Sequence, residues 1–75
     1  MNITGRELTA ARMLTGFSQR HFAARAGVNP DTINRLETAG AGYPKAKPAT
    51  LDRILTCLGQ YGVAIAPGGI IHTKR

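Results

Sequence analysis

A short stretch near the middle of the chain constrains its fold more than any other feature. Gly27 interrupts a helix-forming segment, and two residues later Asn29 offers a strong N-cap. Pro30 then occupies the first position of a new helix, where its missing N–H costs nothing. The sequence therefore predicts two short helices, at about residues 18–26 and 30–38, that meet at a tight turn on Gly27.

The side chains on these two helices fit a helix-turn-helix. Ala23 is small enough to let the helices cross closely, and Val28, Ile33 and Leu36 can fill the angle between them. With those residues turned inward, the helix at about residues 30–38 exposes a face rich in hydrogen-bonding groups. The residues on this face are Pro30, Asp31, Thr32, Asn34 and Arg35. Such a face can read base edges in the DNA major groove. The alternative is a plain helical hairpin in some other small bundle.

Two further helices and a hairpin are predicted around this pair. Thr4 and Glu7 have the spacing of a capping box, which starts a helix at about residues 4–15. A proline followed by an apolar stripe predicts another helix at about 48–60. Residues 63–73 contain two β-prone runs separated by Pro and Gly. Because an isolated hairpin is marginal, we expect it to pack on the helices, to pair with another subunit, or to be partly disordered.

Size and charge agree with this architecture. A chain of 75 residues can form one domain with a thin core, so residues 1–75 are expected to be a single all-α domain of four helices with a short C-terminal β-hairpin. Ten Lys and Arg against four Asp and Glu give a net charge of +6, which suits a nucleic-acid partner.

Several other classes of protein are disfavoured. One cysteine, Cys57, cannot form an internal disulfide, and with His21 and His72 it provides no set of metal ligands. The chain has no nucleophile beside a base, no phosphate-binding glycine loop and no paired carboxylates, so we expect neither an enzyme nor a cofactor. It has no membrane-spanning stretch or signal peptide, and we expect it in the cytoplasm, associated with the nucleoid.

The segment QRHFAARAGVNPDTINRLE carries a spaced pattern of Gln19, Ala23, Gly27 and Ile33. In this pattern the chain resembles the Cro/CI-type, or XRE-like, family of helix-turn-helix regulators. The resemblance extends from Ile3 to Leu58 and includes the runs TGRELTAARMLTGFSQ and PATLDRILTCLG. It implies a lambda-repressor-like fold and a transcription regulator that binds a double-stranded DNA operator through its third helix.

The resemblance and the chemistry of the side chains together assign base-reading roles. The candidate base readers are Pro30, Asp31, Thr32, Asn34 and Arg35. Arg35 can donate twice to the O6 and N7 atoms of guanine, and the alternative for it is a phosphate contact. Asn34 can pair with adenine or face away from the groove. Asp31 either accepts from a cytosine amine or favours the helix N-terminus by its charge.

A second set of residues is expected to contact DNA phosphates, namely Gln19, Arg20, Asn29, Tyr43, Lys45 and Lys47. Gln19 and Arg20 lie in the first turn of a helix, whose free N–H groups attract anions, and the alternative for Arg20 is a solvated surface residue. The loop lysines are placed where related repressors follow the DNA backbone, although plain solvation is the alternative. The resemblance also implies that Arg12 and Glu37 form a structural ion pair that orients the recognition helix.

One recognition helix contacts few base pairs, so a twofold homodimer on half-sites about 34–36 Å apart is expected. The candidate interface residues are Leu55, Cys57, Val63, Ile65, Ile70 and Ile71, and the alternative is that most of them simply complete a small core. A function of another class stays open, in which the same fold is a protein-interaction module such as an antitoxin or antiactivator. The protein partner would then be polymerase or another regulator.

Overall fold

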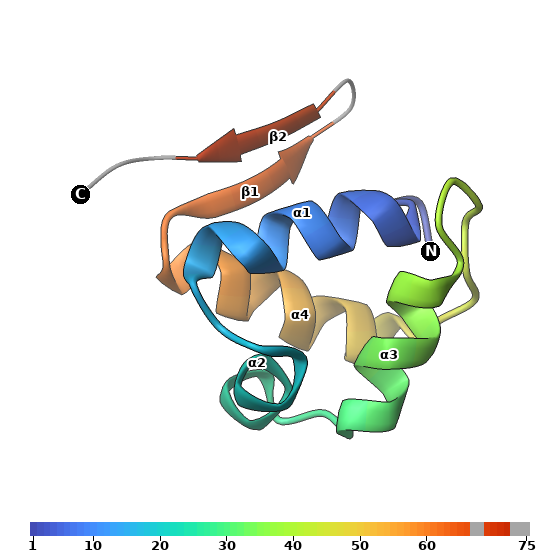
Figure 1. Cartoon of the computed structure of the whole chain (residues 1–75), viewed down its shortest axis with the longest axis horizontal. Coiled ribbons are helices and arrows are strands. Elements are labelled where there is room, and N and C mark those ends of the chain that lie inside the picture. Colours follow the sequence, from blue (N-terminus) through green and yellow to red (C-terminus); the bar gives the residue numbers. More distant parts are fainter. Residues whose placement is uncertain (67–68, 73–75) are drawn as a thin grey trace.

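Four helices and an antiparallel hairpin make up the structure, a computed structural model that describes residues 1–66 and 69–72 (Figure 1). The elements are α1 (Gly5–Thr15), α2 (Gln19–Ala26), α3 (Pro30–Thr38), α4 (Pro48–Gln60), β1 (Val63–Ala66) and β2 (Gly69–His72). This architecture confirms the predicted helix-turn-helix fold with a C-terminal hairpin. Each helix begins and ends within one residue of its predicted bounds. Residue 73, the predicted end of the hairpin, lies outside the described residues.

Local side-chain chemistry explains where the helices begin. The Thr4 hydroxyl accepts from the backbone N–H of Glu7 at 3.0 Å, and the Glu7 carboxylate accepts from the backbone N–H of Thr4 at 2.8 Å. The Asn29 side chain accepts from the backbone N–H of Asp31 at 2.8 Å, with Pro30 at the first helical position. These bonds satisfy N–H groups that the first turn of a helix cannot pair internally.

The turn between α2 and α3 depends on Gly27. Its backbone adopts the left-handed conformation, with φ 75° and ψ 32°, and its N–H donates to the carbonyl of Ala23. Residues with a Cβ rarely adopt this conformation. The turn therefore ends α2 and lets α3 leave at a steep angle to it (Figure 1).

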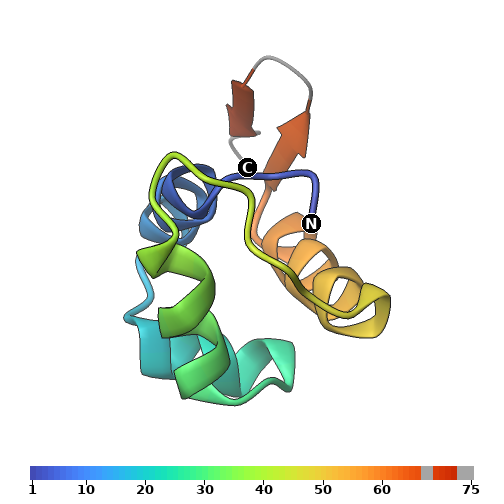
Figure 2. The same ribbon diagram turned by 90° about the vertical axis from the view of Figure 1, so that its right-hand side faces the viewer.

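All four helices and β1 contribute to one core. Its largest fully buried side chains are Phe22, Leu8, Ile33, Leu36, Ile54, Leu58 and Val63. Because Val63 is only 1% exposed, the hairpin is joined to the helices by this core, and it packs against α1 and α4. Of the three alternatives for the hairpin, the structure thus shows packing on the helices. It leaves the hairpin on the opposite side of α1 from α2 and α3 (Figures 1 and 2).

Two of the residues predicted at a dimer interface belong instead to this core. Cys57 is 2% exposed and Val63 is 1% exposed within a single chain. The prediction was wrong for both, because so small a core needs the apolar side chains of α4 and β1 for itself. Leu55, Ile65 and Ile70 are half-buried, and the side chain of Ile71 lies outside the described residues.

Candidate nucleic-acid interface

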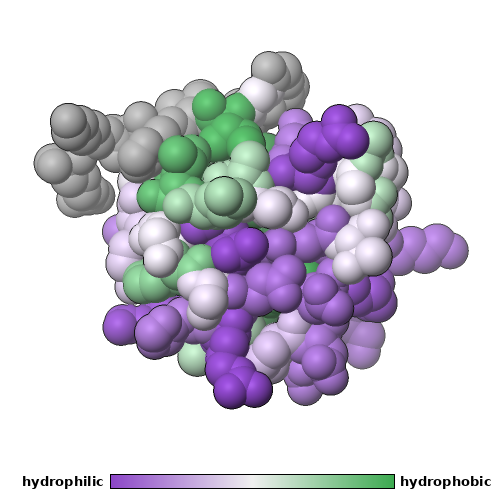
Figure 3. Space-filling model, in the orientation of Figure 1, coloured by the Kyte–Doolittle hydropathy of each residue, from purple (hydrophilic) through white to green (hydrophobic). Residues whose placement is uncertain are grey.

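The exposed face of α3 collects the predicted base-reading residues. Ile33 and Leu36 are fully buried and fix which side of α3 faces the core. The opposite side presents Pro30, Asp31, Asn34 and Arg35 as exposed residues and Thr32 as a half-buried one. Hydrophilic residues dominate the half of the molecule that carries α2 and α3, whereas apolar residues gather beside the hairpin (Figure 3).

The orientation of α3 is fixed by a buried carboxylate at its end. Glu37 accepts from Arg12 Nε at 2.8 Å and from Arg12 Nη2 at 3.2 Å, so the structure brings the expected ion pair together in a two-point contact. The side chains are 14% exposed for Arg12 and 5% for Glu37. Arg12 also donates to the carbonyl of Phe17 at 2.7 Å. This pair joins α1 to α3 and to the segment that leads into α2.

Two more side chains reach the same carboxylate, and the sequence had not indicated them as its partners. Thr9 Oγ1 lies 3.1 Å from Glu37 Oε1, and Gln19 Nε2 donates to that oxygen at 2.9 Å. Thr9 stands three residues before Arg12 on α1, which places both on one helix face, and this spacing was an available signal. The amide of Gln19 is therefore directed into the protein, and its predicted phosphate contact stays a prediction.

The other predicted phosphate contacts are exposed residues on α2, at the start of α3 and in the loop after α3. Arg20 is exposed in the first turn of α2. Asn29 is exposed at the start of α3, where its side-chain oxygen caps the helix. Tyr43, Lys45 and Lys47 are exposed in the loop between α3 and α4.

Backbone hydrogen bonds hold that loop against α1. The N–H of Arg6 donates to the carbonyl of Gly40 at 2.7 Å, and the N–H of Gly5 donates to the carbonyl of Gly42 at 3.3 Å. The loop crosses the start of α1 on its way to α4 (Figure 2). Arg35 Nη1 donates to the carbonyl of Lys45 at 3.0 Å, which ties the loop to α3 as well.

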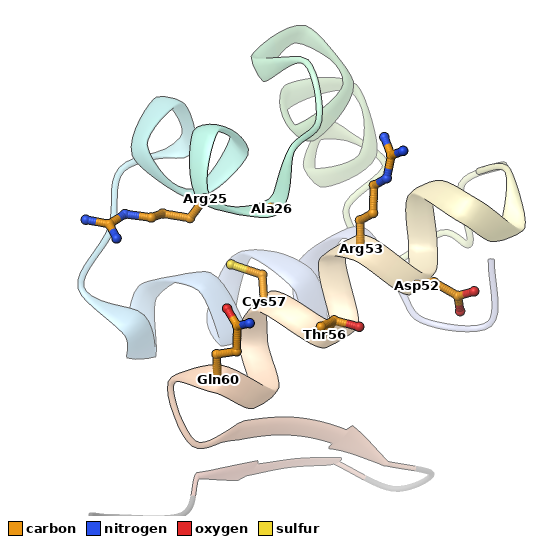
Figure 4. A pocket seen from close by; sticks show the side chains of 7 residues that line it. All are labelled: Arg25, Ala26, Asp52, Arg53, Thr56, Cys57 and Gln60. Carbon is orange, nitrogen blue, oxygen red and sulfur yellow. The ribbon is translucent and has the colours of Figure 1, made fainter.

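A small cavity between α2 and α4 contains the cysteine (Figure 4). It measures about 220 Å³ and is lined by Arg25, Ala26, Asp52, Arg53, Thr56, Cys57 and Gln60. Arg53 is turned toward the α2–α3 turn, where it donates to the carbonyl of Gly27 at 3.2 Å. Burial raises the pKa of the Cys57 thiol above its ordinary value, and nearby Arg25 lowers it by a smaller amount.

We expect Cys57 to be unreactive in the folded protein. The nucleophile in alkylation is the thiolate. The raised pKa of Cys57 keeps the fraction of thiolate low, and burial of the side chain keeps reagents from reaching the sulfur. Alkylation by iodoacetamide at pH 8 should be more than about tenfold slower in native protein than in denaturant. Equal rates under the two conditions would contradict this placement of the side chain.

The described part of the chain contains neither a metal-binding cluster nor a helix able to span a membrane. Within it, no three His, Cys, Asp or Glu side chains gather in a way that could hold a metal ion. None of the described helices has the length and apolar character needed to cross a membrane.

Comparison with known proteins identifies the family. The helix-turn-helix domain family matches residues 4–66, from the N-cap of α1 to the end of β1. No curated protein and no solved structure gives a significant match. The matched region contains the Gly27 turn, the α3 face and the loop that follows it. The chain belongs to the helix-turn-helix domain family.

Proposed function

We propose that this protein is a sequence-specific transcription regulator that binds a double-stranded DNA operator through α3. The observation that carries the proposal is the exposed face of α3. This helix is the second helix of the helix-turn-helix, and exposed cationic residues precede and follow it in the chain. Arg20 is exposed at the start of α2, and Lys45 and Lys47 are exposed in the loop that follows α3. The net charge of +6 supports a polyanionic partner.

The start of α3 is the part best placed to contact bases. In a helix-turn-helix, the N-terminal residues of the recognition helix reach the base edges. Asp31 is exposed and Thr32 is half-buried in this turn, and Asn34 is exposed further along. Asn34 offers both a donor and an acceptor, the combination that pairs with adenine.

The proposal includes a Cro/CI-type homodimer that acts in the cytoplasm as a repressor or autoregulator on an inverted repeat. Exposed apolar side chains on α1 support a dimer interface. Met13 is 66% exposed and Leu14 is 43% exposed on α1, the helix that also carries the hairpin. Ile65 and Ile70 on the hairpin are half-buried, and apolar residues gather beside the hairpin (Figure 3).

The test is a fluorescence titration against the duplex upstream of the protein's own gene and against a shuffled duplex of equal length. The wild type should prefer the upstream duplex at both low and moderate salt. Asn34→Ala should weaken binding to that duplex by about 10- to 100-fold, because one bidentate base contact is lost, and leave binding to the shuffled duplex unchanged. Equal, weak binding of the wild type to both would contradict the proposal and favour the protein-interaction module.

A further inference from the structure

Arg35 lies farther from the start of α3 than the other candidate base readers. It is five residues beyond Pro30, which places it about 7–8 Å along the helix axis. Its guanidinium is turned toward the following loop, because Nη1 donates to the carbonyl of Lys45 at 3.0 Å. In this orientation the Arg35 side chain faces the loop between α3 and α4, at one edge of the candidate DNA interface.

On that edge, Arg35 lines a shallow depression with residues of the loop. The depression measures about 420 Å³, and its walls are Arg35, Lys45, Ala46 and Lys47. All of these residues except Ala46 are cationic. Positively charged residues therefore border this depression, which is a favourable place for an anionic group.

The start of α4 adds to the positive character of this depression. Lys47 is the N-cap residue of α4 and makes no side-chain capping hydrogen bond. The first turn of a helix has free N–H groups and the positive end of the helix dipole, both of which favour a phosphate oxygen. The helix terminus and the cations thus favour the same ligand chemistry.

We propose that Arg35, Lys45 and Lys47 form a clamp for one phosphate group of the DNA backbone, and that Arg35 contributes affinity without sequence preference. The inference rests on the proposed DNA-binding function and selects between the two roles left open for Arg35. A guanidinium has five N–H donors, so Arg35 can keep its bond to the Lys45 carbonyl and still donate to a phosphate oxygen in the depression. Reaching a guanine edge instead requires that bond to break.

With this assignment, only the other side chains on this face of α3 read the sequence. Phosphate contacts position a protein on the duplex, whereas base-edge contacts specify the sequence. Asp31, Thr32 and Asn34 then determine which operator is preferred. Arg35 then fixes the distance between α3 and the DNA backbone. The loop that shares the phosphate is held against α1 by backbone hydrogen bonds from Gly5 and Arg6.

The test is selection of binding sites from a randomized duplex pool by the wild type, by Arg35→Ala and by Asn34→Ala, followed by titrations over a range of salt. Arg35→Ala should enrich the same motif as the wild type. It should bind the selected and shuffled duplexes more weakly by the same factor, and the slope of log K against log salt should decrease in magnitude by about 1. Asn34→Ala should change the enriched motif.

Two further variants separate the clamp from a general effect of charge. Arg35→Lys should keep most of the affinity and the motif, because a lysine can bind phosphate but cannot donate the planar pair of bonds that guanine accepts. Arg25→Gln removes a positive charge at a position that points away from α3 (Figure 4) and should leave the motif and the relative preference unchanged. Circular dichroism melting confirms that each variant is folded.

The outcomes distinguish the clamp from the function on which it rests. If Arg35→Ala and Arg35→Lys both lose a guanine from the enriched motif while binding to the shuffled duplex is unchanged, Arg35 is a base reader and the clamp is overturned. If the wild type enriches no motif, the proposed function fails, and the clamp fails with it.

Discussion

Replacing Gly5 with alanine is expected to lower the free energy of unfolding by about 3 kcal/mol or more, because the new methyl group has no space. A Cβ at this position would lie 2.4 Å from the Leu36 carbonyl oxygen, 2.7 Å from that of Glu37 and 2.8 Å from the backbone nitrogen of Gly40. All three are backbone atoms at the end of α3 or just beyond it, so no rotation of a side chain can relieve the contact. The variant must separate α1 from α3.

Gly59→Ala is the matched control for this substitution. Gly59 is exposed within α4, and a Cβ there meets nothing within 4 Å. Alanine is the better helix former, so this variant should be more stable than the wild type by about 0.5–1 kcal/mol. Urea denaturation followed by circular dichroism measures both changes. A Gly5→Ala protein within about 0.5 kcal/mol of the wild type would show that α1 and α3 do not approach this closely.

Replacing Glu37 with glutamine is expected to destabilise the fold by about 3 kcal/mol, because it leaves the Arg12 guanidinium largely buried without its countercharge. The carboxylate accepts from Arg12 at two points and from Thr9 and Gln19 at one each. A glutamine side chain keeps the shape but replaces one acceptor oxygen with a donor. The junction of α1, α2 and α3 should then loosen, and DNA binding should weaken with it.

A double-mutant cycle with Arg12→Met isolates the pair from its surroundings. Each single variant leaves one buried charge unpaired, whereas the double variant leaves none, so the double should be clearly more stable than the sum of the two single losses predicts. Thermal and urea unfolding supply the free energies. Single losses below about 1 kcal/mol, with no coupling between the sites, would instead describe an exposed pair and contradict the buried arrangement.

Local chemistry made the helices predictable from the sequence. The capping pair of Thr4 and Glu7 and the succession of Gly27, Asn29 and Pro30 act on the backbone within a few residues of themselves. Such signals need no knowledge of the tertiary structure, which is why the helix bounds agree so closely. The exposed face of α3 followed from the same periodicity, since Ile33 and Leu36 identify its buried side.

Contacts between distant segments were not predictable in the same way. The close approach of Gly5 to the end of α3 and the bond from Gln19 to Glu37 join residues far apart in the sequence. The bond from Arg35 to Lys45 depends on how the loop returns to α4. For Cys57 the sequence left a dimer interface and a place in the core as alternatives, and only the packed core shows that the chain buries this side chain itself.

The most direct test of the central claim is to ask whether the wild-type protein selects a sequence at all. Repeated rounds of binding to a randomized duplex pool at moderate salt, with sequencing of the bound fraction, provide the measurement. A sequence-reading dimer predicts enrichment of an inverted repeat whose half-sites lie about 10 bp apart, centre to centre. A pool that stays random after several rounds, while binding persists at low salt, would contradict the account and leave only non-specific attraction to phosphates.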